Sequence, residues 1–591
     1  MSDQRNLILA IVLSVGIILV FQVFYEMPRQ RALQEAQQQE AAELAAAGGD
    51  GTITPQPTQG AATSGNVVVP GMEGAQGQQR ETVVAERASL KIDNGRLHGS
   101  LPLAGDRIDD ITLADYHTEL SPSSPEIELL DPAGTANTYF AESGWVADDA
   151  ATPVPTADTV WTTDAEAISA NKAVSMQWDN GAGLLFEKTV TLDENYMFEL
   201  TRKVTNNGSE PVALYPYDLV SRWGTPKISG FYILHEGPIG VMDGTLTEID
   251  YSDLQEDGDV EMTTTGGWLG ITDKYWLTAL VPDQAEPLTA TFRHSLKDGQ
   301  SRYQVDYLWQ KRTIAPGETA SVTHHFFAGA KEVYKLDAYS EKFGIPLFDR
   351  AVDFGWFYFL TKPIFHVLEF FYGLIGNYGI AILCLTLVVK LLFFPLANKS
   401  YKAMSQMKKL QPKMQELRER YGEDKQKMQQ ELMALYKKEK VNPMAGCLPI
   451  IVQIPVFFSL YKVLFVNIEM RHAPFFGWIK DLSAPDPTSV FNLFGLLPFD
   501  PPQMLMIGAL PLMMGFTMWL QQRLNPQPAD PVQAKVMMFL PVMFTFLFAT
   551  FSAGLVLYWT WNNILSIAQQ WIIMRKMGVG VDGQNTATPS S

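Results

Sequence analysis

The sequence predicts a membrane α-helical bundle, made of a signal-anchor helix and a five-helix core, joined to a large external all-β sandwich domain. Three observations predict this fold class. Several apolar segments are long enough to cross a bilayer as helices. The residues before most of them contain short β-type runs about every ten residues. A basic, amphipathic stretch separates two of the apolar segments, as expected for a loop between membrane spans.

Composition excludes several classes of protein. The chain of 591 residues has a formal net charge of −19, and residues 25–350 carry 49 Asp+Glu against 23 Lys+Arg, which argues against nucleic acid as a direct partner. The two cysteines, Cys384 and Cys447, form neither a disulfide framework nor a CxxC motif. No Walker A loop, HExxH or GxSxG motif occurs. We therefore expect no enzyme activity, no cofactor and no metal site.

The chain begins with a predicted transmembrane anchor at 1–26. Its apolar part runs from Leu7 to Tyr25, follows Arg5, and lacks a small-residue cleavage pattern, so it is interpreted as uncleaved. Residues 27–80 are rich in Gln, Ala, Gly, Thr and Pro, a composition typical of a flexible linker.

Residues 81–345 are predicted to form one large β-sandwich, because runs of Val, Thr, Leu and aromatic residues alternate with Gly, Asn, Asp and Pro. Its tryptophans, for example Trp268 and Trp309, are interpreted as packing residues. His324 and His325 are adjacent on a predicted strand and should face opposite sides, so they cannot form a simple paired metal site. The residues of this domain indicate no chemistry.

Residues 346–377 are expected to hold an amphipathic helix, about Phe354–Leu374, lying in the membrane interface. Lys362, His366 and Glu369 recur at helical spacing on one face, which is typical of such a helix. A full membrane span is the alternative interpretation.

The core, 378–577, starts with the apolar stretch Tyr378–Leu396, which contains Lys390 and, one turn earlier, Thr386. The two side chains share a helix face. An ammonium group inside a span is expensive, so Lys390 either extends towards the lipid headgroups or faces a polar cavity.

A helical hairpin is predicted at 398–440, where 12 Lys+Arg accompany 6 Asp+Glu and apolar residues recur every three or four positions. One interpretation is a loop whose charge only sets topology, and the other is a docking arm for an anionic or emerging partner. Because exposed ion pairs contribute little, changes of single charges such as Lys408 or Lys409 are expected to be nearly silent. Gly422 is expected to end the first helix.

Four more apolar segments follow, at about Pro443–Phe465, Gln503–Gln522, Val536–Phe551 and Gly554–Met574, before a tail at 578–591. Gln453, Trp559 and Asn563 lie within them. Each alone is explained by contacts between helices, but together with Thr386 and Lys390 they suggest a wet cavity bounded by three helices. The helix cores after residue 378 lack Asp and Glu, so an ion-coupled transporter is disfavoured.

The basic loops set the expected orientation. The hairpin is the strongest basic loop and is therefore expected in the cytoplasm, which places the amino terminus inside and the β domain outside.

Over nearly the whole chain, the sequence resembles the YidC/Oxa1/Alb3 membrane insertases of the Gram-negative YidC type. The motifs that carry the resemblance are GCLPIIVQIPVFFSLYKVL after the hairpin, SAGLVLYWTWNNILSIAQQ near the end, and a short stretch with Ala473, Pro474, Phe475, Trp478, Asp481, Leu482 and Ser483.

The resemblance implies a positively charged groove that receives hydrophilic parts of newly made membrane proteins, with Lys390, Thr386, Gln453 and Trp559 as contacts. The family usually has arginine at the position of Lys390. Lysine keeps the charge but loses the planar donor fork. The resemblance also implies a periplasmic β domain similar to galactose mutarotases, without a basis here for sugar chemistry.

The sequence thus predicts a membrane protein insertase and folding chaperone of the bacterial inner membrane, with substrate-binding residues Lys390, Thr386, Gln453, Trp559 and Asn563. Its expected partners are nascent inner-membrane proteins, subunits of the Sec translocon, the ribosome and the lipid bilayer. A polytopic small-solute transporter is the alternative function.

Overall fold

The computed structural model describes residues 78–228, 234–297, 299–421, 424–439, 441, 448–497, 499, 501–502, 506–525 and 531–577. The predicted anchor (1–26), nearly all of the predicted linker (27–80) and the tail (578–591) lie outside these residues. So do Gly422, Cys447 and the start of the apolar segment predicted at Pro443.

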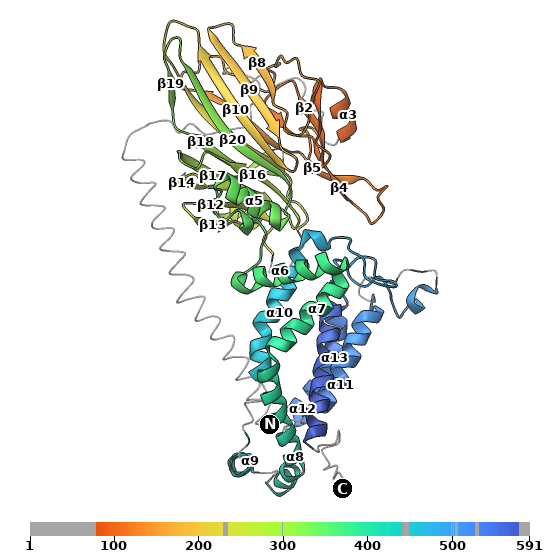
Figure 1. Ribbon diagram of the computed structural model, residues 1–591. Coiled ribbons are helices and arrows are strands. Elements are labelled where there is room, and N and C mark those ends of the chain that lie inside the picture. Colours follow the sequence, from red (N-terminus) through yellow and green to blue (C-terminus); the bar gives the residue numbers. More distant parts are fainter. Residues whose placement is uncertain are drawn as a thin grey trace. The chain divides into compact units, whose positions relative to one another are not determined.

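A small sheet opens the described part of the β domain, after the short helix α3 (Arg80–Ala85) (Figure 1). Its five strands have the order β5-β4-β2-β1-β7, and all neighbours are antiparallel except β1 and β7. Their bounds are β1 Ser89–Asp93, β2 Leu97–Pro102, β4 Ile111–His117, β5 Glu126–Leu130 and β7 Ala167–Ile168.

Two larger antiparallel sheets make up the rest of the domain. The eight-stranded sheet, in the order β13-β12-β15-β16-β20-β10-β9-β8, consists of β8 Val174–Asp179, β9 Leu184–Leu192, β10 Met197–Asn206, β12 Gly237–Met242, β13 Thr245–Glu248, β15 Trp268–Thr272, β16 Trp276–Val281 and β20 Thr319–Ala330. The seven-stranded sheet, β14-β17-β18-β11-β6-β3 with β19 beside β11, consists of β3 Arg107–Ile108, β6 Tyr139–Ala147, β11 Val212–Trp223, β14 Val260–Thr265, β17 Pro287–Lys297, β18 Gln300–Trp309 and β19 Arg312–Ile314. Helix α4 (Tyr251–Asp257) precedes β14.

The two larger sheets face each other, which confirms the predicted β-sandwich. Arg202 of β10 forms a fully buried ion pair of 2.7 Å with Asp218 of β11 in the opposite sheet. His324 of β20 also reaches Asp218, at 3.0 Å, whereas His325 turns the other way to Glu199 at 3.4 Å. The two histidines thus face opposite sides, as the sequence predicts. The small sheet is the feature that the prediction of a single sandwich did not include.

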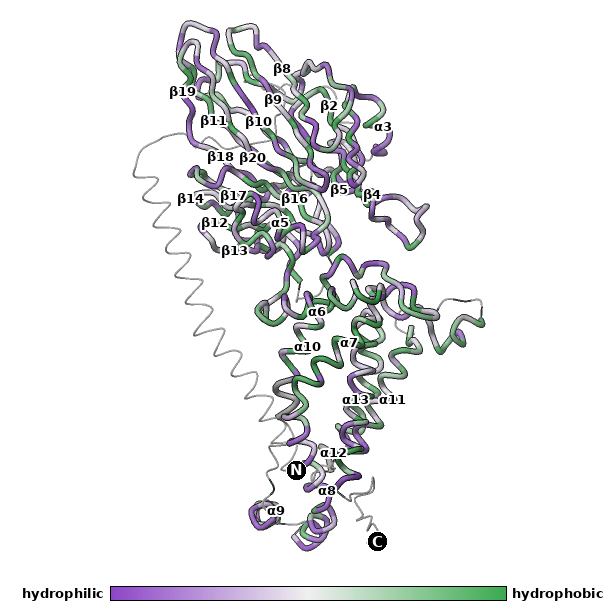
Figure 2. Tube along the Cα trace, in the orientation of Figure 1, coloured by the Kyte–Doolittle hydropathy of each residue, from purple (hydrophilic) through white to green (hydrophobic). Residues whose placement is uncertain are grey.

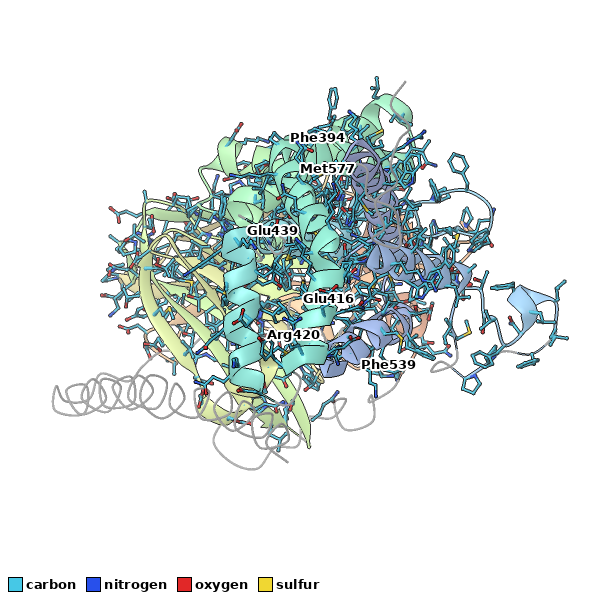
Figure 3. The ribbon with its side chains drawn as sticks, turned by 90° about the horizontal axis from the view of Figure 1, so that it is seen from below. Phe394, Glu416, Arg420, Glu439, Phe539 and Met577 are labelled. Carbon is cyan, nitrogen blue, oxygen red and sulfur yellow. The ribbon has the colours of Figure 1, made fainter. Side chains whose placement is uncertain are left out.

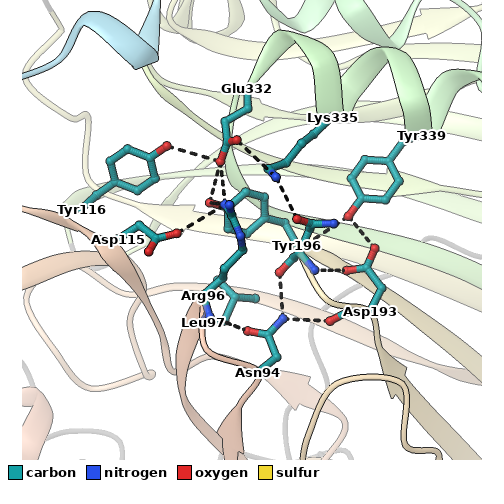
Figure 4. A network of polar contacts seen from close by, with 11 residues as sticks. Asn94, Arg96, Leu97, Asp115, Tyr116, Asp193, Tyr196, Glu332, Lys335 and Tyr339 are labelled. Atoms are coloured by element: carbon teal, nitrogen blue, oxygen red, sulfur yellow. Dashed lines mark hydrogen bonds and ion pairs between the residues drawn. The ribbon is translucent and has the colours of Figure 1, made fainter. Parts of the chain in front are cut away.

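A polar network ties the small sheet to the sandwich and to helix α5 (Val333–Phe343) (Figure 4). Arg96, beside β2, donates to Tyr196 Oη and to Glu332 Oε1, both at 2.9 Å, and Tyr196 Oη donates to the same carboxylate. On α5, Tyr339 donates to Asp193 at 2.6 Å. These charge-assisted bonds hold α5 against the β domain.

Helix α6 (Tyr358–Ile375) follows the short helix η2 (Phe348–Ala351). Its polar residues contact protein. Lys362 lies 2.8 Å from both Asp337 of α5 and Asp349 of η2, and Glu369 accepts hydrogen bonds from Tyr378 and Asn467. The predicted polar face of α6 is therefore correct, and its charged residues contact neighbouring segments of the protein. The interfacial position of α6 stays a prediction.

The first apolar segment of the core ends earlier than predicted. Helix α7 (Tyr378–Leu392) stops before Phe393, and α8 (Phe394–Tyr421) begins at an angle of 70° to it. Pro395 explains the break, since a proline ring clashes with the carbonyl four residues earlier and prevents a straight continuation. The bent pair α7–α8 passes a test of length and hydropathy for a membrane span, and no single helix in the described part of the chain does so.

The remaining helices match the predicted order. Helices α8 and α9 (Lys425–Lys438) form the predicted hairpin and are joined by an ion pair of 2.7 Å between Lys413 and Glu439. They are followed by α10 (Leu448–Val466), α11 (Ala509–Leu524), α12 (Pro531–Phe548) and α13 (Ala553–Lys576), with the short helices η4 (Ile468–Met470) and η5 (Leu493–Gly495) between α10 and α11. Hydrophobic residues line α7 and α10, whereas α9 is mostly hydrophilic (Figure 2).

The segment after α10 connects the helices to the β domain. Arg471 donates to the carbonyl oxygen of His117 at 2.6 Å, and the carboxyl group of Glu469 lies near the backbone of Val333 at the start of α5. The Lys274 ammonium lies 3.7 Å from the ring centroid of Phe465, where it makes a cation–π contact. We call this segment, residues 467–483, the junction segment.

Candidate functional site

A cavity of about 520 Å³ lies among the helices of the core. Residues of α7, α8, α10, α11, α12 and α13 line it, so it is bounded by six helices where the sequence suggested three. Most of its wall is apolar, and amide and hydroxyl groups gather on α10, α11 and α13. Among the lining residues that the structure describes, Lys390 is the one charged side chain.

Lys390 comes from the last turn of α7, just before the bend into α8. Its Nζ donates to Ser566 Oγ of α13 at 2.7 Å, and Ser566 in turn donates to the carbonyl oxygen of Asn562. The ammonium group is thus held by a hydroxyl oxygen. No carboxylate on the described wall of the cavity neutralises its positive charge.

Gln453 reaches the cavity from α10. Its Nε2 donates to Tyr558 Oη of α13 at 2.9 Å. Pro455, two residues further on, lacks an N–H and leaves the carbonyl of Ile451 without its helical partner. Both features make this part of α10 more polar than its apolar sequence suggests.

Trp559 and Asn563 lie one turn apart on α13, as predicted, and both line the cavity. The Trp559 ring packs edge-on against Phe457, with 4.8 Å between the ring centroids and an angle of 89°. Asn563 is buried and donates to Thr517 Oγ1 of α11 at 3.2 Å. Trp559 therefore belongs to the apolar wall, and Asn563 joins α13 to α11.

Thr386 is not among the residues that line this cavity, and its expected role as a substrate contact stays a prediction. It is buried, and its hydroxyl group donates to the carbonyl oxygen of Ile382, one turn earlier, at 2.6 Å. A threonine in a helix commonly satisfies its hydroxyl in this way. Thr386 and Lys390 share a helix face, but the long lysine side chain reaches the cavity, and the short threonine side chain stays within the packing of α7.

Polar residues of α11 and α8 also line the cavity and were not predicted from the sequence. Gln521, Gln522 and Asn525 line the cavity from the end of α11, and Tyr401 lines it from α8. The sequence does change from apolar to polar residues at the end of the α11 segment, but the same change occurs at the ordinary end of a membrane span, so it did not indicate a cavity. These residues line the cavity because α8 folds back beside α11 and α13.

Comparisons with known families match both parts of the chain. The family described as "YidC periplasmic domain" matches residues 89–367, and the family described as "60Kd inner membrane protein" matches residues 370–579.

Curated relatives match nearly the full length. The chain is 49% identical to the membrane protein insertase YidC of Methylobacterium nodulans, over 98% of this chain and 96% of that protein. It is 48% identical to the protein of the same name from Rickettsia felis, over 96% of this chain and 98% of that protein. A solved structure titled as an active YidC insertase with its first transmembrane domain aligns over 82% of this chain and 94% of that chain, with 19% identity and a TM-score of 0.34.

Proposed function

The chain belongs to the YidC family of membrane protein insertases, and from this we propose that its helical cavity takes up hydrophilic segments of newly made proteins on their way into the inner membrane. The family is one of insertases and not of enzymes. The proposal is supported by the cavity, whose lining in the described part of the chain holds one ammonium group, that of Lys390, among amide and hydroxyl groups.

The cavity offers a translocating segment two things that hydrocarbon lacks. Gln453, Gln521 and Asn563 can exchange hydrogen bonds with backbone groups, which are costly to leave unpaired in lipid. The Lys390 ammonium attracts carboxylates. At an effective dielectric constant of 20, a carboxylate 4 Å from it gains about 4 kcal/mol. Acidic tails are therefore the substrates that depend most on Lys390.

The apolar part of the substrate takes a different route in this mechanism. Aromatic side chains of α10 and α13, such as Phe457 and Trp559, form an apolar wall beside the polar groups. A hydrophobic helix moves along this wall into lipid, driven by the burial of its apolar surface in hydrocarbon. The same wall can shield apolar segments before they pack, which is the chaperone role.

The orientation and the partners are part of the proposal. The basic hairpin lies in the cytoplasm, where it meets the ribosome and its nascent chain, and the β domain lies in the periplasm. Subunits of the Sec translocon are further partners in this proposal. The lipid bilayer is the destination of every substrate, and nucleic acid is no direct partner.

The experiment replaces Lys390 in cells that depend on this chain and follows insertion of a reporter whose translocated tail carries two or three acidic residues. Lys390→Arg should insert the reporter as the parent does, Lys390→Ala should insert it several-fold more slowly, and Lys390→Glu should fail. A reporter with a neutral tail should be less sensitive to all three changes. Lys399→Glu, at an exposed lysine of α8, is the matched control and should behave as the parent.

Equal insertion by Lys390→Glu and the parent, at equal protein levels, would rule out the role of the cavity charge. A defect in the uptake of a small solute, with normal insertion of all reporters, would instead support the transporter alternative.

A further inference from the structure

The base of the hairpin is fastened to the ends of two core helices. We propose that Lys408 is a positioning residue that holds the C-terminal end of α11 against α8 and so sets the width of the cavity at its hairpin end. The inference rests on the proposed function of the cavity and adds to it the groups that keep one of its walls in place.

Lys408 is buried, although it lies in a run of charged residues that resembles a solvated surface. Only 3% of the residue is exposed, and its Nζ donates to the carbonyl oxygens of Arg523 at 3.0 Å and Leu524 at 3.2 Å. These are the last residues of α11, whose final carbonyls have no partner within the helix. A cation at this end also interacts favourably with the helix dipole.

A second side chain holds the same carbonyl. Gln570 of α13 is 1% exposed, and its Nε2 donates to the Leu524 carbonyl oxygen at 3.1 Å and to Asn525 Oδ1 at 3.0 Å. The end of α11 is therefore clasped from two sides, by α8 and by α13. We call Lys408 and Gln570 together the α11 clasp.

The next residue fastens α8 to α13 as well. Lys409 Nζ donates to the carbonyl oxygen of Met577, just after the end of α13, at 2.8 Å. Figure 3, which views the hairpin from below, shows Met577 beside α8 and the more distant turns of α8 lying next to α9. Pro412 follows within α8 and removes one backbone hydrogen bond there. The hairpin thus has a fixed base before Pro412 and an outer arm after it.

The fixed base is also a wall of the cavity. The cavity is lined from α8 by Leu396, Ala397 and Tyr401, which lie about two to three turns before Lys408, and from the clasped end of α11 by Asn525. If α11 loses the clasp, its end can move away from α8, and the lining residues at that end become more accessible. Removing a hydrogen bond from a charged donor shifts such an equilibrium by about tenfold or more.

The test measures the reaction of a cysteine placed at Gln522, in a chain whose Cys384 and Cys447 are replaced by serine. A membrane-impermeant maleimide is added from the hairpin side to inverted vesicles, and insertion of the acidic-tail reporter is measured in parallel. Lys408→Met should raise the labelling rate by about tenfold, and Lys408→Arg, which keeps the donors, should restore it. Lys402→Met, at an exposed lysine of the same helix, should have no effect.

Gln570→Leu gives an independent approach if Lys408→Met accumulates poorly. This variant should also raise the labelling rate. In the double variant the rate should rise by less than the product of the two single increases, because both side chains hold Leu524 and their effects are not independent. Unchanged labelling in Lys408→Met and in Gln570→Leu would overturn the proposal and leave the role of Lys390 intact. Faster labelling with unchanged insertion would keep the clasp and would count against the proposed function of the cavity.

Discussion

Replacing Glu469 with glutamine is expected to stabilise the protein at alkaline pH and to change little at pH 5. Glu469 lies in the junction segment, where its carboxyl group is close to the backbone of Val333. Burial, followed by the nearby carboxylate of Glu369, raises the pKa of Glu469 to about 8. Glutamine has nearly the same size and shape as glutamate and cannot become charged.

The sign follows from the two pKa values. In the unfolded chain the carboxyl group loses its proton above its ordinary pKa of 4.5, whereas in the folded chain it keeps the proton up to about pH 8. Ionisation therefore favours the unfolded state increasingly as the pH rises through this window, and the effect is constant above pH 8. The difference corresponds to at most about 5 kcal/mol, and we expect about 2–5 kcal/mol, since the surroundings relax around the charge.

The assay is thermal unfolding in detergent at pH 5 and at pH 8.5, followed by circular dichroism. The Glu469→Gln variant should unfold several degrees above the parent at pH 8.5 and close to it at pH 5. Glu341→Gln, at an exposed glutamate of α5, is the control and should leave both midpoints unchanged. A gain of equal size at both pH values, or a loss at pH 8.5, would refute the reasoning.

Two further predictions concern packing and domain structure. Gly515→Ala should lower the unfolding midpoint, because the added Cβ would lie 1.9 Å from Thr545 Oγ1 where α11 approaches α12, and overpacking costs about 1–3 kcal/mol. Gly373→Ala in α6, where a Cβ meets nothing within 4 Å, should instead raise the midpoint slightly, and equal effects of the two alanines would contradict this packing. Deleting residues 89–330 should leave a core that accumulates and inserts substrates, provided that residues 331–353 remain to pair Asp337 and Asp349 with Lys362 and Asp353 with Lys462. Immunoblotting of membranes and the insertion assay measure the outcome, and loss of insertion at normal protein levels would show that the β domain is required.

The sequence determined the type and order of the elements. The apolar segments predicted at Gln503–Gln522 and Gly554–Met574 appear as α11 (Ala509–Leu524) and α13 (Ala553–Lys576), and the β domain is a sandwich. Hydropathy and periodicity are local properties of the chain, so they predict helices and strands without knowledge of the fold. The position of Lys390 inside the first apolar segment of the core was also evident, because charged residues are rare in such segments.

Only the tertiary structure decided what each polar side chain contacts. Lys390 and Thr386 share a helix face, yet one reaches the cavity and the other bonds to its own helix. The spacing of charged residues predicted a polar face on α6, and the structure shows that Lys362 on this face pairs with Asp337 and Asp349.

Lys408 shows the same limit most clearly. In the sequence it is one of many lysines of the hairpin, and its replacement was expected to be silent; in the structure it is buried against the end of α11. Helical periodicity determines which residues share a face, and it contains no information about which distant segment covers that face. That choice depends on the bend between α7 and α8, which brings α8 beside the ends of α11 and α13, and hence on packing between residues more than 100 positions apart.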